Sequence, residues 1–125
     1  MVATNFKIRF ELPDGSVRSA WAGAEEHILD AARRAGLDLP SACEVGWDLA
    51  CACQVVAGDF DNSDARRYFP QDAEDGFALI CTAKARSDLV IRTHQREAMR
   101  EHRASHGLPA PRGNWGVRQP RARTG

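Results

Sequence analysis

Hydrophobic and polar residues alternate at the start of the chain and predict a β-hairpin. Phe6, Ile8 and Phe10 are separated by charged residues, and this period of two is typical of a strand with one buried face. The Asp-Gly pair at 14–15 is a strong turn signal, and the chain returns as a second strand over residues 17–21. We therefore expect two antiparallel strands in the first part of the chain.

The pattern then changes to helical spacing and later returns to short strands. Ile28, Leu29, Ala32 and Ala35 form one apolar stripe, and Gly36 suits the position that ends a helix. Short apolar or alternating runs predict further strands at residues 54–57, 77–80 and 89–93. One main helix among several short strands is the expected arrangement.

Three stretches carry weaker signals. Residues 59–75 are acidic, rich in turn formers and poorly periodic, whereas residues 94–105 predict a polar, exposed helix. Glycine, proline and arginine dominate residues 107–125, which cannot bury enough apolar surface to offset the entropy of ordering. We therefore expect one domain over residues 1–106 and a disordered basic tail over residues 107–125.

Charge is unevenly distributed although the formal net charge is zero. Residues 1–91 carry 9 Lys or Arg and 15 Asp or Glu, whereas residues 92–125 carry 8 Arg and 2 Glu. A basic end of this kind can attract an anionic partner, but no nucleic-acid-binding motif accompanies it. We expect a solvated extension against the acidic body, and no nucleic-acid partner.

Neither a membrane span nor an export signal is expected. No stretch reaches the ~20 apolar residues that a membrane span needs, and the first residues lack an apolar signal region. A cytoplasmic monomer is therefore the expectation.

All four cysteines lie where a soft metal centre would need them. Cys43, Cys51 and Cys53 crowd one segment, and Cys81 follows a short apolar run. Thiolates gathered in this way bind zinc or iron–sulfur clusters. Zinc ribbons supply two closely spaced pairs, and here Cys81 stands alone. Two disulfides in a secreted protein are another use of four cysteines, and the missing signal region argues against them.

The cysteine spacing favours an iron–sulfur centre. Plant-type centres use C-x₄-C-x₂-C and a remote fourth cysteine. Cys43 and Cys51 are separated by the first-to-third interval of that motif, so the second ligand falls at position 48, where this chain has Asp48. Cys53 lies two residues past the third position and outside the pattern.

The segments around these cysteines resemble the plant-type, or chloroplast-type, ferredoxin family. The similar segments occur in family order and at family spacing: HILDAA at 27–32, AGLDLP at 35–40, VVAG at 55–58, GF at 76–77, LIC at 79–81 and SDLVI at 87–91. The resemblance implies an α+β, β-grasp (ubiquitin-like) fold, with a mixed sheet, one main helix and a cluster-binding loop. It also implies a 2Fe-2S cluster and one-electron transfer by a carrier that is not itself an enzyme.

The same resemblance assigns ligand roles. Cys43 and Asp48 would hold the outer iron, which takes the electron, and Cys51 and Cys81 would hold the inner iron. Aspartate keeps the negative charge of a thiolate but offers a harder donor with a shorter reach. Three alternatives stay open: Asp48 is the fourth ligand, Cys53 replaces it after the loop rearranges, or the chain is a β-grasp interaction module without a stable cluster.

Four arginines bear on the partners that the resemblance implies. Chloroplast-type ferredoxins dock through acidic surfaces, yet Arg33 and Arg34 stand at helix positions where the family tends to be acidic. Arg67 stands where the family has a rim aromatic, and Arg96 where it has an acidic docking residue. Like charges opposed across an interface slow encounter and weaken binding. We therefore expect a ferredoxin reductase that is not of the photosynthetic type, and an oxygenase-like redox enzyme as the acceptor.

Overall fold

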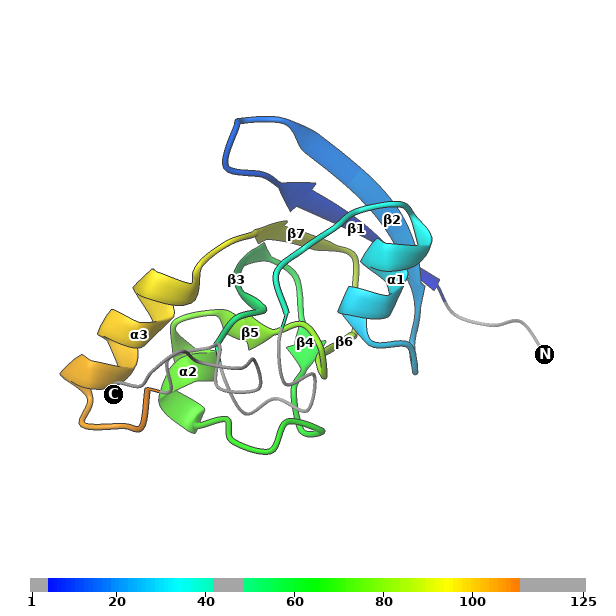
Figure 1. Cartoon of the computed structure of the whole chain (residues 1–125). Coiled ribbons are helices and arrows are strands. Elements are labelled where there is room, and N and C mark those ends of the chain that lie inside the picture. The colour runs from blue at the N-terminus through cyan, green and yellow to red at the C-terminus, as the bar shows by residue number, and fades with distance from the viewer. Residues whose placement is uncertain (1–4, 42–48, 111–125) are drawn as a thin grey trace.

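The structure is a computed structural model that describes residues 5–41 and 49–110, and it is built around a five-stranded mixed sheet (Figure 1). The strand order is β2-β1-β7-β3-β5, with β1 and β7 parallel and the other neighbours antiparallel. A small second sheet pairs β4 with β6. The elements are β1 (Asn5–Glu11), β2 (Val17–Gly23), α1 (Ile28–Arg34), β3 (Ala52–Ala57), β4 (Phe60–Asp61), α2 (Pro70–Glu74), β5 (Phe77–Leu79), β6 (Lys84–Ala85), β7 (Leu89–Arg92) and α3 (Arg96–Ser105). This arrangement confirms the β-grasp fold.

The predicted hairpin is confirmed, and its buried face begins the core. Ile8 and Phe10 are fully buried, and Ile8 lies opposite Ala20 in the β1–β2 register. Gly15 has a φ of +88° in the turn, a conformation that glycine adopts without steric cost. The alternation of the sequence therefore sets which side of the hairpin faces inward.

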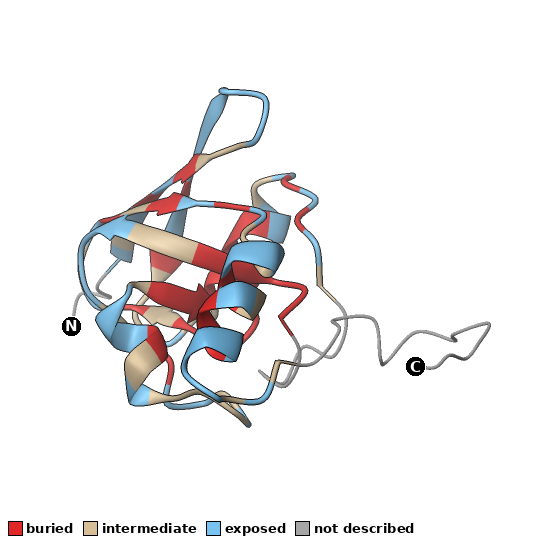
Figure 2. Cartoon of the chain, turned by 90° about the vertical axis from the view of Figure 1, so that its left-hand side faces the viewer, coloured by how far each residue is buried: buried red, intermediate tan, exposed pale blue. Residues whose placement is uncertain are grey.

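Helix α1 lies over the same core. Its four buried residues, Ile28, Leu29, Ala31 and Ala32, have the spacing of one helix face. Gly36 follows the last turn with a φ of +87°, and its N–H donates to the carbonyl of Arg33, so the predicted end of the helix is confirmed. Figure 2 shows the buried residues concentrated on the central strands and on the inner sides of the helices.

The two stretches with weak sequence signals are more ordered than expected. Residues 59–75 contain strand β4 and helix α2. Helix α3 contacts both α2 and β3, and the expectation of an exposed helix was wrong for one of its faces. Met99 and Arg103 are fully buried there, and His102 is 8% exposed.

The first residues of the predicted tail continue from α3 with defined contacts. The N–H of Leu108 donates to the carbonyl of Arg103, and the carbonyl of Pro109 accepts from the Arg103 side chain. Residues 111–125 lie outside the described part of the chain, so the disordered tail stays a prediction. In the part that is described, none of the helices has the length and apolar character that crossing a membrane requires.

Candidate metal centre

Two of the predicted ligands, Cys51 and Cys81, meet in the interior. Cys51 directly precedes β3 and Cys81 follows β5, and these two strands pair with Ala52 opposite Leu79. The pairing brings the two thiols together although they are 30 residues apart, and their sulfurs lie 3.3 Å from each other. Their residues are 3% and 5% exposed, so the contact is shielded from water.

The geometry of this pair suits a soft metal. A disulfide would need ~2.05 Å between the sulfurs, and the described cysteines are free thiols. Two thiolates bound at ~2.3 Å to one tetrahedral metal lie about 3.8 Å apart, which is close to the observed separation. The hydrogen bond to Cys81 and burial raise the pKa of Cys51 well above its usual value. Two thiolates this close therefore need a bound cation to offset their charge.

A buried asparagine fixes the turn that carries Cys81. The side chain of Asn62 accepts a hydrogen bond from Leu79 N–H at 2.8 Å and donates to the Thr82 hydroxyl at 2.9 Å. Asn62 is 5% exposed, and sequence reasoning missed it because it lies in the stretch without periodicity. The Asn-Ser-Asp sequence at 62–64 signals only a turn.

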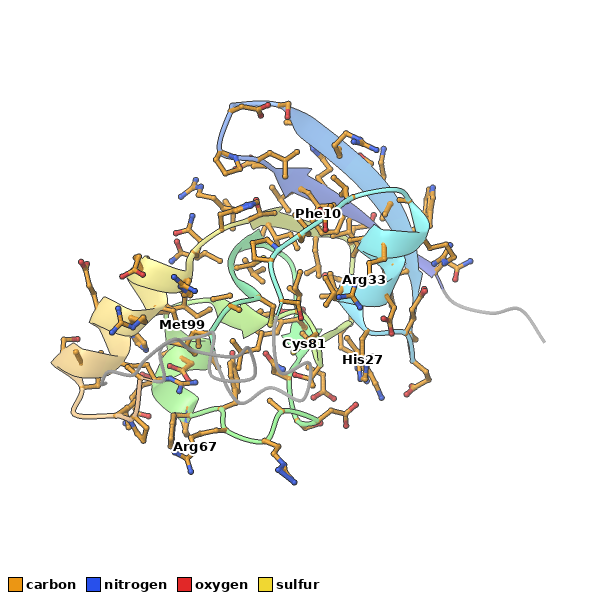
Figure 3. All side chains as sticks on the ribbon, in the orientation of Figure 1. Phe10, His27, Arg33, Arg67, Cys81 and Met99 are labelled. Carbon is orange, nitrogen blue, oxygen red and sulfur yellow. The ribbon has the colours of Figure 1, made fainter. Side chains whose placement is uncertain are left out.

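The start of α1 holds the same turn from the other side. The N–H of Ile28 donates to the carbonyl of Ala83, and the N–H of Leu29 donates to that of Ile80, both at 2.9 Å. Just before α1, His27 lies 3.0 Å from the carboxylate of Asp64. The main helix, which the sequence predicted, thus has a second role in positioning Cys81 (Figure 3).

Cys53 is not brought to this pair. Among the described residues no group of three or more His, Cys, Asp or Glu side chains is placed to hold a metal ion. Cys53 is 2% exposed, and burial raises its pKa to about 12, although the backbone N–H of His94 donates to its sulfur. The other two predicted ligands, Cys43 and Asp48, lie outside the described residues.

Comparison with known proteins identifies the family. Residues 12–86 match the 2Fe-2S iron-sulfur cluster binding domain. The chain is 36% identical to Ferredoxin-2 of a Synechococcus species over 85 residues, which are 68% of this chain and 81% of that protein. It is 37% identical over 92 residues to the reductase component of propane 2-monooxygenase from Rhodococcus jostii, covering 72% of this chain and 24% of that protein.

A solved structure supports the same family assignment. Phthalate dioxygenase reductase, described as a modular structure for electron transfer from pyridine nucleotides to 2Fe-2S, matches with a TM-score of 0.53 and 28% identity. The match covers 72% of this chain and 27% of that one, so the chain spans about a quarter of this larger protein.

The family match covers more than half of the chain and includes both Cys51 and Cys81. Its relatives include proteins named as ferredoxins, which carry electrons and are not enzymes. This favours electron transfer over a module that has lost its cluster. The chain therefore belongs to the 2Fe-2S iron-sulfur cluster binding domain family, as an electron carrier of the ferredoxin type.

Proposed function

We propose that this chain carries single electrons from a reductase to an oxygenase-type enzyme in the cytoplasm. The observation that carries the proposal is the buried Cys51–Cys81 pair, which has ligand spacing in a chain of this family. The 2Fe-2S cluster supplies the site that accepts and releases one electron. The residues of the chain hold that site, limit its contact with water and present it to a partner.

The oxygenase class is supported by the relatives. One of them is the reductase component of a monooxygenase, and a structural neighbour is a dioxygenase reductase. In those proteins the part similar to this chain is one portion of a longer polypeptide. We propose that this chain is a monomer.

The described arginines support a partner unlike the photosynthetic reductases. The side chain of Arg34 is 60% exposed although it forms an ion pair with Glu26 at 2.6 Å. Arg96 is 43% exposed at the start of α3, where it lies 3.6 Å from Glu97. Because each of these exposed arginines offsets the charge of an acidic neighbour, the surface around it attracts a basic reductase less strongly.

For the ligands we propose Cys43, Asp48, Cys51 and Cys81, with Cys53 outside the set. The position of Cys53 supports this choice, because it is buried and is not grouped with Cys51 and Cys81 in the described part of the chain. Asp48 oxygen donates less electron density than sulfur, so the reduction potential is expected above the ~−400 mV of plant-type centres.

The test is anaerobic reconstitution followed by iron, sulfide and potential measurements on the parent protein and on Asp48→Cys. The parent should bind iron and sulfide in the ratio of one 2Fe-2S cluster, and Asp48→Cys should lower the potential and slow cluster loss in acid. A parent and an Asp48→Cys variant that both fail to hold iron would overturn the electron-transfer function. An equal potential in the two proteins would overturn the role of Asp48 alone.

A further inference from the structure

Arg103 is a fully buried arginine on a helix whose sequence is mostly polar. Its Nε lies 3.2 and 3.1 Å from the two carboxylate oxygens of Asp72, and its Nη2 lies 2.9 Å from one of them. Asp72 is itself 0% exposed. A buried charge is costly unless it is paired and hydrogen-bonded, so this ion pair holds α3 and α2 together.

Arg103 also donates to two backbone carbonyls. Nη1 donates to the carbonyl of Pro109 at 2.9 Å, and Nη2 donates to the carbonyl of Arg67 at 3.1 Å. The guanidinium carbon lies 4.8 Å from the centre of the Phe69 ring. One side chain therefore joins α3 to α2, to the segment before α2 and to the chain that follows α3.

The other end of α3 is attached beside the inner cysteines. The N–H of Gln95, the residue before the helix, donates to the carbonyl of Ala52 at 2.9 Å, and Ala52 directly follows Cys51. Helix α2 leads into β5 and then to Cys81. Helix α3 thus spans from the segment that carries Cys51 to the segment that carries Cys81, with the fully buried Met99 between its two attachments (Figure 3).

This helix lies beyond the part of the chain that defines the family. The family match ends at residue 86, and α3 covers Arg96–Ser105. Both cysteines therefore lie within the family match, whereas α3 packs against β3 and α2 from outside it.

We propose that Arg103, through its pair with Asp72, is a positioning residue for the inner cysteine pair. It keeps α3 closed over β3 and α2, and so keeps Cys51 and Cys81 at ligand spacing and away from water. The proposal rests on the ligand roles of Cys51 and Cys81 in the proposed function. Hydrogen bonding and solvent exposure set the potential of such a cluster. Reduction adds negative charge to the cluster, and water stabilises that charge. If α3 moved away from β3 and α2, water would reach the cluster more easily and its reduction potential should rise.

The experiment uses the full reconstituted chain with Arg103→Met, Arg103→Met combined with Asp72→Leu, and Arg100→Met as the matched control. Arg100 lies on the same helix, where it pairs with the exposed Glu97. For each protein, the rate of cluster bleaching by an iron chelator, the midpoint potential and the urea unfolding curve are measured.

Arg103→Met leaves Asp72 as a buried charge without its main partner, so bleaching should accelerate by about tenfold or more. Its potential should also rise. The double variant removes both charges, so its bleaching rate and its potential should lie between those of Arg103→Met and the parent, because the bonds of Arg103 to Pro109 and Arg67 stay lost. Arg100→Met should match the parent. An unchanged potential, with bleaching that follows only the loss of stability in urea, would show that Arg103 serves the fold alone.

A second variant decides the case in which Arg103→Met does not fold. Arg103→Lys keeps the positive charge but cannot reach Asp72, Pro109 and Arg67 at once, so a smaller rise in potential is expected. A potential equal to the parent's would overturn the proposal. Failure of the parent to bind a cluster would instead overturn the proposed function, which the iron and sulfide content of the parent tests first.

Discussion

Replacing Cys53 by alanine tests whether Asp48 or Cys53 is the fourth ligand of the cluster. The described structure buries Cys53 apart from the Cys51–Cys81 pair. If Cys53 is a packing residue, Cys53→Ala should lose some stability and keep the cluster. If Cys53 is the fourth ligand after a rearrangement of the loop, the same change should abolish cluster binding.

The expected loss of stability follows from the burial of the side chain. Cys53 is 2% exposed, so removing its sulfur loses nearly the whole transfer free energy of one methylene-sized group, ~0.8 kcal/mol, and leaves a small cavity. The N–H of His94 also loses its acceptor, which adds about 1 kcal/mol if water does not replace it. A total of about 1–2 kcal/mol is expected, which the fold should tolerate.

The assay combines urea unfolding with iron, sulfide and absorption measurements after anaerobic reconstitution. Cys51→Ala is the positive control, because it removes a proposed ligand at a similar buried position. Cys53→Ala should retain the iron content and spectrum of the parent, whereas Cys51→Ala should lose the cluster. A folded Cys53→Ala protein without iron, together with a cluster that survives Asp48→Ala, would refute the reasoning and make Cys53 the fourth ligand.

Three further predictions concern pH, backbone and docking. Burial and the charge of Asp72 raise the pKa of Tyr68, so the folded state keeps a proton that the unfolded chain loses above about pH 10. Above that pH, the free energy of unfolding should fall by up to ~1.4 kcal/mol per pH unit. Urea unfolding measured over this pH range should show a smaller fall for Tyr68→Phe, and an equal fall in the two proteins would contradict the assignment. Gly58→Ala should cost at least about 2 kcal/mol, because φ is +104° and the new Cβ would lie 2.2 Å from the carbonyl oxygen of Asp88. Gly15→Ala, with open space around it, is the control and should cost less. Changing Arg67 to an aromatic residue and Arg96 to Glu should speed reduction by a chloroplast-type reductase. A parent protein that is already reduced as fast as a plant-type ferredoxin at equal salt would contradict this prediction.

The elements that the sequence predicted correctly share a clear hydrophobic period. Ile8 and Phe10 alternate with charged residues, and Ile28 and Leu29 belong to a helical stripe that ends at Gly36. Both patterns are local, so they can be read without knowing the partner segment. Helix α2 and strands β4 and β6 were not predicted, because none of them has more than five residues and so none shows a hydrophobic period.

In the candidate site, too, some residues could be predicted from the sequence and others could not. The cysteine spacing indicated a metal centre, and the resemblance to plant-type ferredoxins implied that Cys51 and Cys81 hold the same iron. Asn62 could not, because its partners Leu79 and Thr82 lie 17 and 20 residues away and nothing in the sequence marks it as buried. Contacts of this kind join segments that are far apart in the sequence, and only the folded chain brings them together.

The buried face of α3 also changes the meaning of the charge distribution. From residue 92 to residue 110, every arginine has a carboxylate within 4 Å in the described structure: Arg92 with Glu11, Arg96 and Arg100 with Glu97, and Arg103 with Asp72. Exposed pairs of this type contribute little stability, about 0–1 kcal/mol each, but they reduce the local positive potential. Carboxylates of the folded domain thus offset part of the basic excess that was counted from the sequence. Residues 111–125 hold four arginines and no acidic residue, so salt-dependent attraction to an anionic partner should depend on that segment more than on α3.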